Sequence, residues 1–372
     1  MKQFDLVGDG VKLVLKENVL AVLSDTPLNT VSSAFHNGGG LKKTNAILNV
    51  EIPKSYSDRC LHDDPETFIM NSLKTFGLKE SFIGMVTAAA VENFSLVSKR
   101  DGELAVSVIA TAADNEGNTC NHAELAGETI GVQESEGTIN VIVVIDGNPT
   151  EICLAGTLIT VTEAKVAALR ELDIRSRYSG DEATGTVTDA VVVAETSRGA
   201  PIVYGGPASK LGQLVGYCTR KAVKEAVMKA NECMPCRSLF DRLKERHLSI
   251  EKLASELSKA KNLNVDEKTL AISLTKMLRT DPFSASIVMA AVKIDEDLEK
   301  GLVPPEFGEI EAVSKKFGDV LLSKQTPSNV KALGDLADSS DYDAVDLPPF
   351  LKQVLINIVK VGLSKEKTEN LK

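Results

Sequence analysis

The chain has 372 residues, with 42 Lys and Arg against 52 Asp and Glu, and a formal net charge of −10. Hydrophobic residues make up 43% and charged residues 25%, which is typical of a soluble globular protein. No apolar run approaches the roughly 18–20 residues that a membrane-spanning helix needs, and the N-terminus lacks the apolar stretch of a secretion signal. We therefore expect a cytoplasmic protein with no membrane partner.

The negative charge is concentrated in the first two-thirds of the chain. Residues 1–236 hold 21 basic and 30 acidic side chains, a net −9, whereas residues 237–372 hold 21 and 22, a net −1. Nucleic-acid binding usually requires a basic face, so this balance argues against a nucleic-acid partner. Trp is absent and aromatics are 4%, which also leaves few platforms for base stacking. A neutral or cationic small molecule suits the negative electrostatic field of this region better. The sequence leaves the oligomeric state open, and a homo-oligomer is possible.

The six cysteines all lie before residue 237, at irregular spacing. This pattern is typical of a reducing cytosolic protein rather than of a disulfide framework. Cys233 and Cys236 are the closest pair, and they could form half a zinc site or a redox pair. Since no second pair follows and the four histidines form no HxxxH pattern, we favour a linker thiol pair.

The first two-thirds of the chain mixes strand and helix patterns. Residues 138–146 are rich in β-branched side chains, which predicts a central buried strand. Thr160 and Glu163 form a capping-box pattern that predicts a helix over 160–172. The other expected elements are a hairpin of strands 11–15 and 19–23, a strand at 105–111, a strand at 187–194 and a helix at 212–230.

From about residue 237 the pattern is almost entirely helical. The expected signals are N-caps at Ser249, Asp266 and Asp281, a further start at Thr326-Pro327, a stop at Gly301 and a last apolar helix at 350–363. The composition therefore predicts an α/β domain at 1–236 followed by an all-α domain at 237–372.

Four polar clusters stand beside the predicted strands. Residues 32–40 combine Ser, His and Asn with three glycines, which suits either a ligand site or a flexible loop. Residues 84–90 are small and favour a tightly packed helix start. Residues 137–140 place Thr138 after a glycine, where it is either a nucleophile with a nearby base or an ordinary strand residue. Residues 183–189 hold hydroxyls and a carboxylate that either orient a nucleophile or form a common turn.

In this order the clusters resemble the adenosylcobinamide amidohydrolase family over roughly residues 5–230. The stretches that carry the resemblance are Ser32-Ser33-Ala34, Asn37-Gly38-Gly39, Gly84-Met85, Thr87-Ala88-Ala89, Gly137-Thr138-Ile139-Asn140, Thr162-Glu163-Ala164-Lys165, Ala183-Thr184-Gly185-Thr186 and Thr188-Asp189. The family implies hydrolysis of the amide between the cobyric acid core of adenosylcobinamide and its aminopropanol arm. The product would be adenosylcobyric acid, for corrinoid salvage.

The same resemblance implies a corrinoid substrate and no required cofactor for this domain. A cationic corrinoid also suits the acidic first domain. Glu163 and Lys165, between the third and fourth clusters, are either ligand-binding residues or a capping residue and a solvated helix position. The implied substrate-binding residues are Ser32, Ser33, His36, Gly38, Gly39, Thr87, Asn140, Glu163 and Lys165.

Residues 137–146 are also similar to the segment of DmpA-type aminopeptidases in which a hydroxyl residue after glycine is the nucleophile, freed as a new N-terminus by self-cleavage. This similarity implies an α+β sandwich of the α-β-β-α kind, with Thr138 as the attacking group. Thr186, Thr188 and Asp189 would orient Thr138, and Asn37 or Asn115 would supply an oxyanion donor worth about 3–4 kcal/mol. Near Asn115 a family glycine is replaced by Ala113, and Asn118 competes for the asparagine role.

Residues 243–254 and 294–302 are more weakly similar to the phosphatidylglycerophosphatase A superfamily, which includes an archaeal α-ribazole-phosphate phosphatase. This similarity implies a bifunctional chain, with a divalent metal in the helical domain and Asp295 and Asp297 as metal ligands. A charged helix face explains the two carboxylates equally well. Two rival functions stay open for the first domain: an amidase or aminopeptidase of the same fold on another substrate, and a corrinoid-binding protein without turnover.

Overall fold

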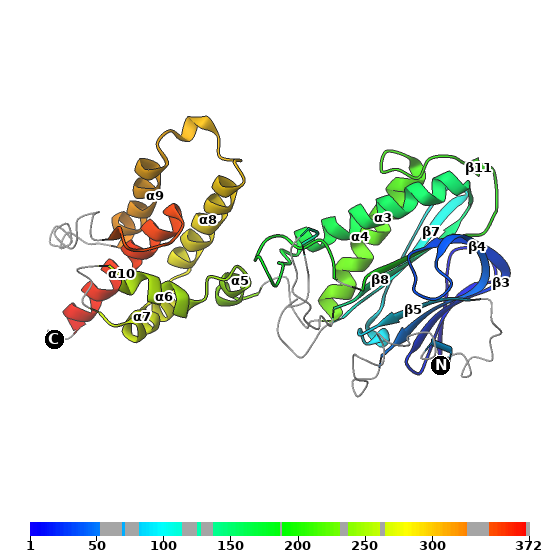
Figure 1. Cartoon of the computed structure of the whole chain (residues 1–372), viewed down its shortest axis with the longest axis horizontal. Helices are drawn as coiled ribbons and strands as arrows, with labels where there is room; N and C mark the ends of the chain where they lie inside the picture. The colour runs from blue at the N-terminus through cyan, green and yellow to red at the C-terminus, as the bar shows by residue number, and fades with distance from the viewer. Residues whose placement is uncertain are drawn as a thin grey trace. The chain divides into compact units, whose positions relative to one another are not determined.

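The computed structural model divides into two compact units, Met1–Arg237 and Ser238–Lys372, one residue from the predicted boundary. Figure 1 shows the sheet and its two long helices in the first unit and the helices of the second. The structure describes residues 1–52, 69–70, 82–113, 125–127, 137–186, 188–230, 237–260, 265–325 and 342–369.

The first unit is built on a nine-stranded sheet that folds over on itself. Its order is β1-β2-β3-β10-β8-β7-β6, and β4 pairs with β3 and β5. β3 (Val19–Ser32) pairs with β2 through residues 19–24 and with β10 through residues 29–32, so this one strand belongs to two layers. The other strands are β1 (Lys2–Asp5), β2 (Val11–Lys16), β4 (Gly39–Glu51), β5 (Phe82–Thr87), β6 (Ser95–Asp101), β7 (Leu104–Ala112), β8 (Ile139–Asp146) and β10 (Ala190–Glu195).

The predicted strands in this unit are confirmed. The hairpin of β2 and β3 turns at Glu17, which adopts a φ of 51°. β8 is central, paired in parallel with β10 and antiparallel with β7. A short 3₁₀ turn (Val91–Asn93) precedes β6, and the two-residue strands β9 (Asn148–Pro149) and β11 (Pro201–Ile202) form a small separate pair.

An apolar core fills the space between the two β layers. Leu20 and Ile47 from one layer belong to the same buried cluster as Ile109, Ile142 and Val192 from the other. Side chains alternate between the two faces of a strand, so the neighbours of these residues point to the outer faces. The interlayer core therefore fixes which side chains of β8 and β10 point inward, between the two layers.

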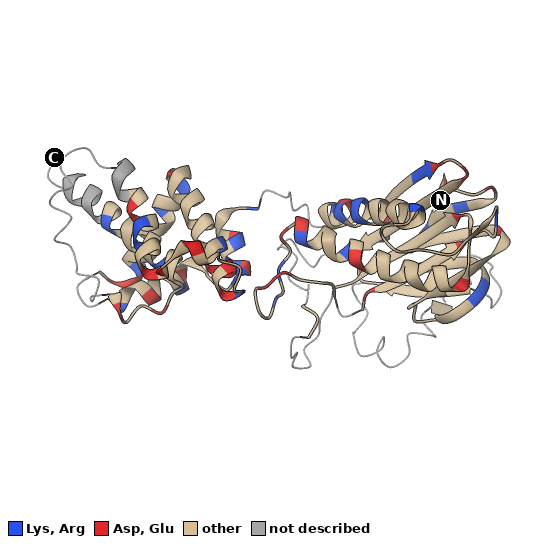
Figure 2. Cartoon of the chain, turned by 90° about the horizontal axis from the view of Figure 1, so that it is seen from above, with Lys and Arg blue, Asp and Glu red and all other residues tan. Residues whose placement is uncertain are grey.

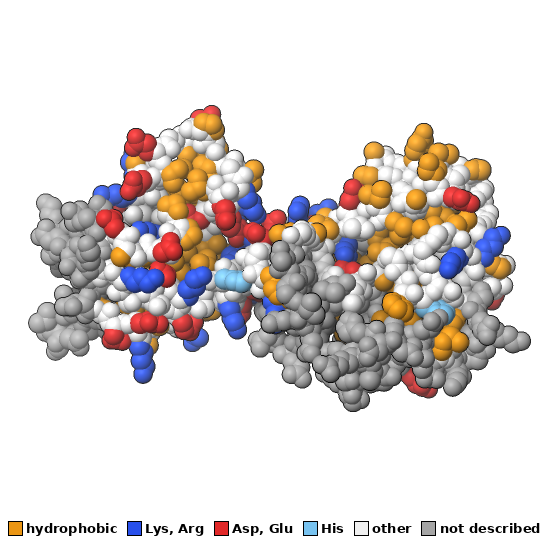
Figure 3. All heavy atoms as spheres, in the orientation of Figure 1, with side chains coloured by type: hydrophobic (Ala, Val, Ile, Leu, Met, Phe, Trp, Pro, Cys, Tyr) orange, Lys and Arg blue, Asp and Glu red, His pale blue; other side chains and the backbone are white. Residues whose placement is uncertain are grey.

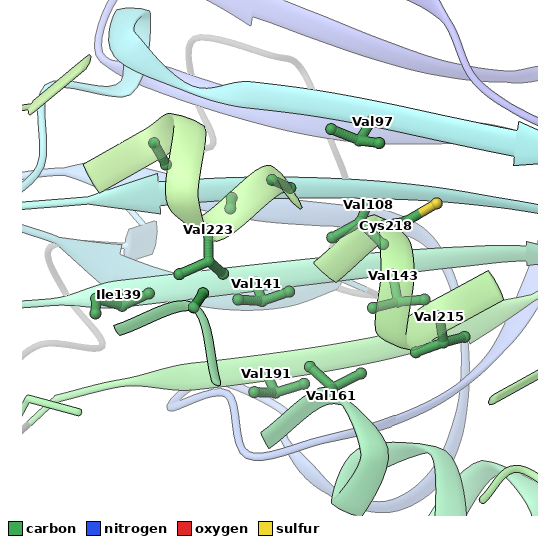
Figure 4. Packing of buried hydrophobic residues seen from close by; sticks show 14 of the residues in the cluster. Val97, Val108, Ile139, Val141, Val143, Val161, Val191, Val215, Cys218 and Val223 are labelled. Atoms are coloured by element: carbon green, nitrogen blue, oxygen red, sulfur yellow. The ribbon is translucent and has the colours of Figure 1, made fainter. Parts of the chain in front are cut away.

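Two long helices, α3 (Glu151–Glu171) and α4 (Lys210–Ala230), cover the outer face of the β10-β8-β7-β6 layer. Figure 4 shows Val141 and Val143 of β8 packed with Val161 of α3 and with Val215 and Val223 of α4. The α/β class of this unit is confirmed, and three layers of the expected sandwich are present. Its second helical layer is not tested, since residues 53–68 and 71–81 lie outside the described part of the chain.

The capping-box prediction for α3 was wrong. The helix begins at Glu151, and its N-cap is Thr150, whose side chain accepts a hydrogen bond from the Cys153 amide at 3.4 Å. Thr160 lies in mid-helix, where its hydroxyl donates to the Gly205 carbonyl at 2.9 Å. Within the described residues, α3 is the one helix whose length and apolar composition would suffice to cross a membrane. Half of that stretch is buried within the first unit, where α3 packs on the sheet.

The second unit is helical, as predicted. Its helices are α5 (Leu239–Glu245), α6 (Ile250–Ser258), α7 (Glu267–Thr280), α8 (Pro282–Glu299), a 3₁₀ turn (Pro305–Phe307), α9 (Ile310–Gln325) and α10 (Pro349–Glu369). Ser249, Asp266 and Asp281 are N-caps, each accepting a bond from a backbone amide of the first helical turn. Gly301, with a φ of 68°, follows α8, while Thr326-Pro327 lies outside the described residues. Figure 2 shows acidic and basic residues spread over both units.

Candidate active site

The interlayer core becomes polar where β8 begins. Asn140 of β8 donates through Nδ2 to the Asn49 side-chain oxygen at 2.9 Å and to the Val86 carbonyl at 2.8 Å. Its Oδ1 accepts from the Ala190 amide at 3.0 Å, and Asn49 donates to Thr111 Oγ1 at 2.9 Å. This buried network joins β4, β5, β7, β8 and β10 through side chains that are almost fully enclosed.

The Asn140 side chain therefore holds neighbouring strands together. Both of its amide hydrogens and one lone pair of its oxygen are used by the protein, so the predicted substrate-binding role would have to break existing bonds. Sequence reasoning missed Asn49 and Thr111. Each is a polar residue on the inward face of a buried strand, which could have marked it in the sequence. Which residues face inward is known only once the register of the strands is known.

Thr138 directly precedes β8 and is 4% exposed. Its Oγ1 lies 2.7 Å from Oγ1 of Thr188, and the Thr188 hydroxyl also donates to the Gly137 carbonyl at 3.1 Å. A hydroxyl has one hydrogen to donate. When Thr188 donates to Gly137, the Thr138 hydroxyl must therefore donate to Thr188. The three groups form a chain from the Thr138 hydroxyl to the carbonyl of the peptide bond that precedes it.

Asp189 holds the segment next to Thr138. Its Oδ1 accepts from the Ile139 amide at 2.7 Å and from the Thr186 hydroxyl, and its Oδ2 accepts from the Thr186 amide at 3.0 Å and from the Lys165 ammonium. Lys165 reaches this carboxylate from α3, and both side chains are about nine-tenths buried. Gly185 makes room for the pair, because a Cβ there would stand 2.5 Å from Asp189 Oδ2.

The third and fourth sequence clusters and Lys165 are thus brought together. Thr188 contacts Thr138 directly, whereas Asp189 acts on the neighbouring amide and Thr186 bonds to Asp189. Among the described hydrogen bonds of the Thr138 side chain there is none to His, Asp, Glu or Lys. In the described part of the chain, the Thr138 hydroxyl is thus bonded to another hydroxyl group and not to a basic side chain.

The first cluster forms the loop between β3 and β4. The Ser33 amide donates to the Val191 carbonyl at 2.9 Å, and its hydroxyl accepts from the Val191 amide at 3.0 Å. His36 exchanges two backbone bonds with Gly84 at 3.0 Å each, and its ring stacks on Phe82 with centroids 4.4 Å apart. The loop is therefore fastened both to β10 and to β5.

Asn37 is held in the left-handed region, with a φ of 53°. Its Nδ2 lies 3.0 Å from the Phe82 carbonyl and 3.0 Å from His36 Nε2. The Phe82 carbonyl accepts one amide hydrogen of Asn37, and Nε2 of His36 can accept the second in the tautomer that leaves this nitrogen unprotonated, so the Asn37 side chain holds the loop. A Cβ at Gly38 would stand 1.9 Å from the Ala34 carbonyl oxygen, so this turn requires glycine.

The second cluster was expected as a helix start, and this expectation was wrong. Residues 82–87 form β5, paired in parallel with β4. The Thr87 hydroxyl accepts from the Ala89 amide at 3.0 Å, so it shapes the turn after the strand. Small residues suit this strand because His36 and Ile69 pack against Gly84, where a Cβ would stand about 3 Å from both.

Of the remaining sequence candidates, Ser32 and Gly39 lie opposite each other in the β3–β4 pairing. Ser32 ends β3, and its buried hydroxyl has no hydrogen-bond partner among the described residues. Gly39 begins β4 with a φ of 94° and is exposed. Glu163 is exposed on α3. Asn115, Asn118 and the Cys233–Cys236 pair lie outside the described residues.

The two predicted metal ligands of the second unit have protein partners. Asp295 is buried, and its oxygens accept the amides of Phe350 and Leu351 at 3.0 and 2.8 Å, at the start of α10. Asp297 pairs with Lys293 at 2.6 Å on the same helix. Across the described residues of both units, no group of three or more His, Cys, Asp or Glu could hold a metal ion.

Comparisons with known proteins bear on the first unit. The model of the adenosylcobinamide amidohydrolase family matches residues 7–235. The chain is 28% identical over 221 residues to the adenosylcobinamide amidohydrolase of Methanosarcina mazei, covering 58% of this chain and 92% of that one. It is 29% identical over 210 residues to an uncharacterised protein of Methanocaldococcus jannaschii, covering 52% and 80%.

Among solved structures, a β-aminopeptidase of a Burkholderia species matches with a TM-score of 0.31 and 12% identity, over 60% of this chain and 79% of that one. A Pyrococcus horikoshii protein matches with a TM-score of 0.30 and 13% identity, over 59% and 82%. The sequence match spans more than half of the chain and includes all four polar clusters. The chain belongs to the adenosylcobinamide amidohydrolase family.

Proposed function

We propose that this chain hydrolyses the amide that joins the cobyric acid core of adenosylcobinamide to its aminopropanol arm, giving adenosylcobyric acid and aminopropanol. The observation that carries the proposal is the family match over residues 7–235. The Methanosarcina relative, which bears the name of this activity, supports it. The product would return to corrinoid salvage.

Thr138 is the nucleophile of the proposed reaction. Its Oγ attacks the substrate carbonyl carbon, the C–N bond breaks, and the aminopropanol nitrogen leaves with a proton. Water then hydrolyses the ester on Thr138 and releases the acid. Ordered hydroxyl groups around Thr138, with Thr188 at 2.7 Å and Asp189 fixing the next amide, support this assignment.

Self-cleavage between Gly137 and Thr138 would supply a base for the proposed reaction. In that step Thr138 Oγ attacks the Gly137 carbonyl carbon, the C–N bond breaks, and the nitrogen takes up a proton. Water hydrolyses the resulting ester, which leaves a free α-amino group on Thr138 as the base for later turnovers. The hydrogen bond from Thr188 to the Gly137 oxygen polarises the carbonyl under attack.

The test uses purified full-length protein and adenosylcobinamide, with aminopropanol release as the readout. T138A should lose release, and T138S should retain part of it. T162A is a matched control, since Thr162 is an exposed α3 threonine whose hydroxyl bonds to the Leu158 carbonyl of its own helix. Full release by T138A excludes Thr138 as the nucleophile, and intact mass shows whether the Gly137–Thr138 bond is cut.

The same assay separates the rival functions. Binding of adenosylcobinamide without release supports a corrinoid carrier, and neither binding nor release supports an amidase or aminopeptidase for another substrate. Because the proposed chemistry uses side chains and water, we expect release to persist in a metal chelator.

The second activity expected for residues 237–372, hydrolysis of α-ribazole 5′-phosphate, stays a prediction. The partners of Asp295 and Asp297 in the described residues do not favour it. Phosphate release from α-ribazole 5′-phosphate, with and without divalent metal, tests both that activity and the predicted metal.

A further inference from the structure

Lys165 is a charged side chain that the first unit encloses. Lysine side chains usually end in solvent, and Figure 3 shows Lys and Arg side chains on the described surface of both units. Lys165 is instead 7% exposed, because α3 places it on the helix face that also carries the core residues Val161 and Leu169. Its ammonium bonds to the Asp189 carboxylate, which is itself largely buried. Burying a charge in this way costs free energy even when the charge is paired.

Stability alone is a weak explanation for this pair. The attraction between two buried charges only partly offsets the loss of their hydration, so an apolar pair of the same volume would often stabilise the fold equally well. A carboxylate differs from an apolar side chain because its second oxygen can accept a backbone amide. Asp189 Oδ1 accepts from the Ile139 amide at 2.7 Å, while Oδ2 accepts from Lys165. The pair therefore connects α3 to the start of β8.

The peptide group between Thr138 and Ile139 is held at both of its polar atoms. Its nitrogen donates to Asp189 at 2.7 Å, and its oxygen accepts from the Ala113 amide at 2.9 Å. Because a peptide group is planar, these two bonds fix the orientation of the plane that begins at the Thr138 Cα. The Thr138 side chain leaves the backbone at this atom, and its hydroxyl lies 2.7 Å from Thr188 Oγ1. A change in the orientation of Asp189 would therefore shift the Thr138 hydroxyl.

Gly185 leaves just enough room for the pair. A Cβ at this position would stand 2.5 Å from Asp189 Oδ2 and 2.8 Å from Lys165 Nζ, closer than Cβ atoms approach in proteins. Gly185 is not among the glycines with a positive φ, so its backbone suits alanine and only the crowding opposes it. The chain thus has a glycine where a methyl group would push the ammonium and the carboxylate apart.

We infer that Lys165 is a positioning residue that acts on Thr138 through Asp189 and makes no contact with the substrate. The carboxylate transmits the effect because it holds the Ile139 amide. The inference rests on the proposed function, in which Thr138 is the nucleophile, and adds Lys165 and Gly185 to the residues that set its rate. A misplaced nucleophile should lower kcat and leave KM nearly unchanged, since the contacts that bind the substrate stay in place.

The experiment measures kcat and KM for aminopropanol release by full-length protein, with adenosylcobinamide as the substrate. K165M keeps the length of the side chain without its charge, and it should lower kcat about 10- to 100-fold and leave KM within about twofold. K165R retains the charge and should recover part of the loss. The matched control is K224M, whose pair with Glu171 is more exposed, and it should leave both constants unchanged. Rates are compared at an equal fraction of chain cut between Gly137 and Thr138, read from intact mass.

A double-mutant cycle with D189N tests the route of the effect. If Lys165 acts through Asp189, K165M in the D189N background should lower kcat by less than about threefold further. G185A disturbs the same pair without removing either charge and should lower kcat about tenfold. G156A, on α3 where a Cβ would meet no atom within 4 Å, should not lower it. The comparison of these two alanine variants decides the question if K165M does not fold.

A raised KM with native kcat in K165M would assign Lys165 to the substrate, and an equal loss in the D189N background would exclude the route through Asp189. Native kcat in both K165M and G185A would leave the pair a structural role only. In each of these cases, release of aminopropanol by the native chain keeps the proposed function and overturns the inference alone. A native chain that releases no aminopropanol from adenosylcobinamide overturns both.

Discussion

The Thr188 hydroxyl lies 2.7 Å from the Thr138 hydroxyl and donates to the Gly137 carbonyl at 3.1 Å. One side chain thus contacts both the proposed nucleophile and the carbonyl of the peptide bond before it. A threonine side chain that touches both groups can act in self-cleavage and in substrate turnover.

Removing that hydroxyl should impair both steps. T188A should slow aminopropanol release about 100-fold, the order of effect seen when a single transition-state hydrogen-bond donor is removed, and T188S should retain most activity. Steady-state release measures turnover, and intact mass after timed incubation measures cleavage at Gly137–Thr138. Full turnover in T188A would contradict the catalytic role of Thr188.

The ion pair between Lys165 and Asp189 should matter for stability as well as activity. Both side chains are about nine-tenths buried, and Asp189 accepts four donors. D189A would leave the Lys165 charge without this partner and should lower the free energy of unfolding by about 3 kcal/mol, measured by urea denaturation. The matched control is K224A, whose ion pair with Glu171 is more exposed and should cost less than about 1 kcal/mol. Equal losses in the two variants would show that burial of the Lys165 pair adds nothing.

The Asn140 side chain should contribute mainly to the stability of the fold and less to substrate binding. N140A removes a side chain that serves the Asn49 oxygen, the Val86 carbonyl and the Ala190 amide, and each of these groups is left in a buried setting. We expect a loss of about 3 kcal/mol in urea denaturation. A matched variant, N45A, removes an exposed side chain that donates to the Ser24 carbonyl and should cost about 1 kcal/mol or less. If N140A instead unfolds like the native chain while its KM for adenosylcobinamide rises, the side chain would bind substrate, as the sequence resemblance implies.

Local patterns predicted the elements that depend on neighbours in sequence. The β2–β3 hairpin, β8 and the caps at Ser249, Asp266 and Asp281 all follow from residues within a few positions of one another. The same locality explains the error at Thr160, where a capping-box spacing occurs inside a helix that Thr150 already caps.

Features that depend on distant pairing were not predictable in this way. β3 continues past its hairpin to pair with β10, 160 or more residues later in the sequence, and that pairing brings Ser33 to Val191. Thr138 and Thr188 are 50 residues apart, and their contact follows from the parallel register of β8 and β10. The family resemblance implied that Thr138, Thr188 and Asp189 act together. Only the fold shows that Thr188 contacts the Thr138 hydroxyl, whereas Asp189 binds the neighbouring Ile139 amide.

Asp295 gives the second unit a dependence on pH. Burial raises the pKa of this carboxyl to about 6 from an ordinary value of 3.8, against the opposite effect of the Phe350 and Leu351 amides. The folded state therefore holds the proton more tightly than the unfolded state does. Its stabilising contribution is complete below about pH 4 and is lost as the pH rises through about 6, a change on the order of 3 kcal/mol.

D295N cannot ionise, so its stability relative to the native chain should increase by about that amount between pH 4 and pH 7. Hydrogen exchange of peptides that cover α10, corrected for the intrinsic effect of pH on exchange, measures the opening free energy in both proteins. D297N is the matched control, since Asp297 lies on the same helix in a more exposed pair with Lys293, and its difference from the native chain should change much less over this range. A D295N difference that stays flat from pH 4 to 7, or that moves in favour of the native chain, would show that the amides of α10 outweigh the burial of this carboxylate.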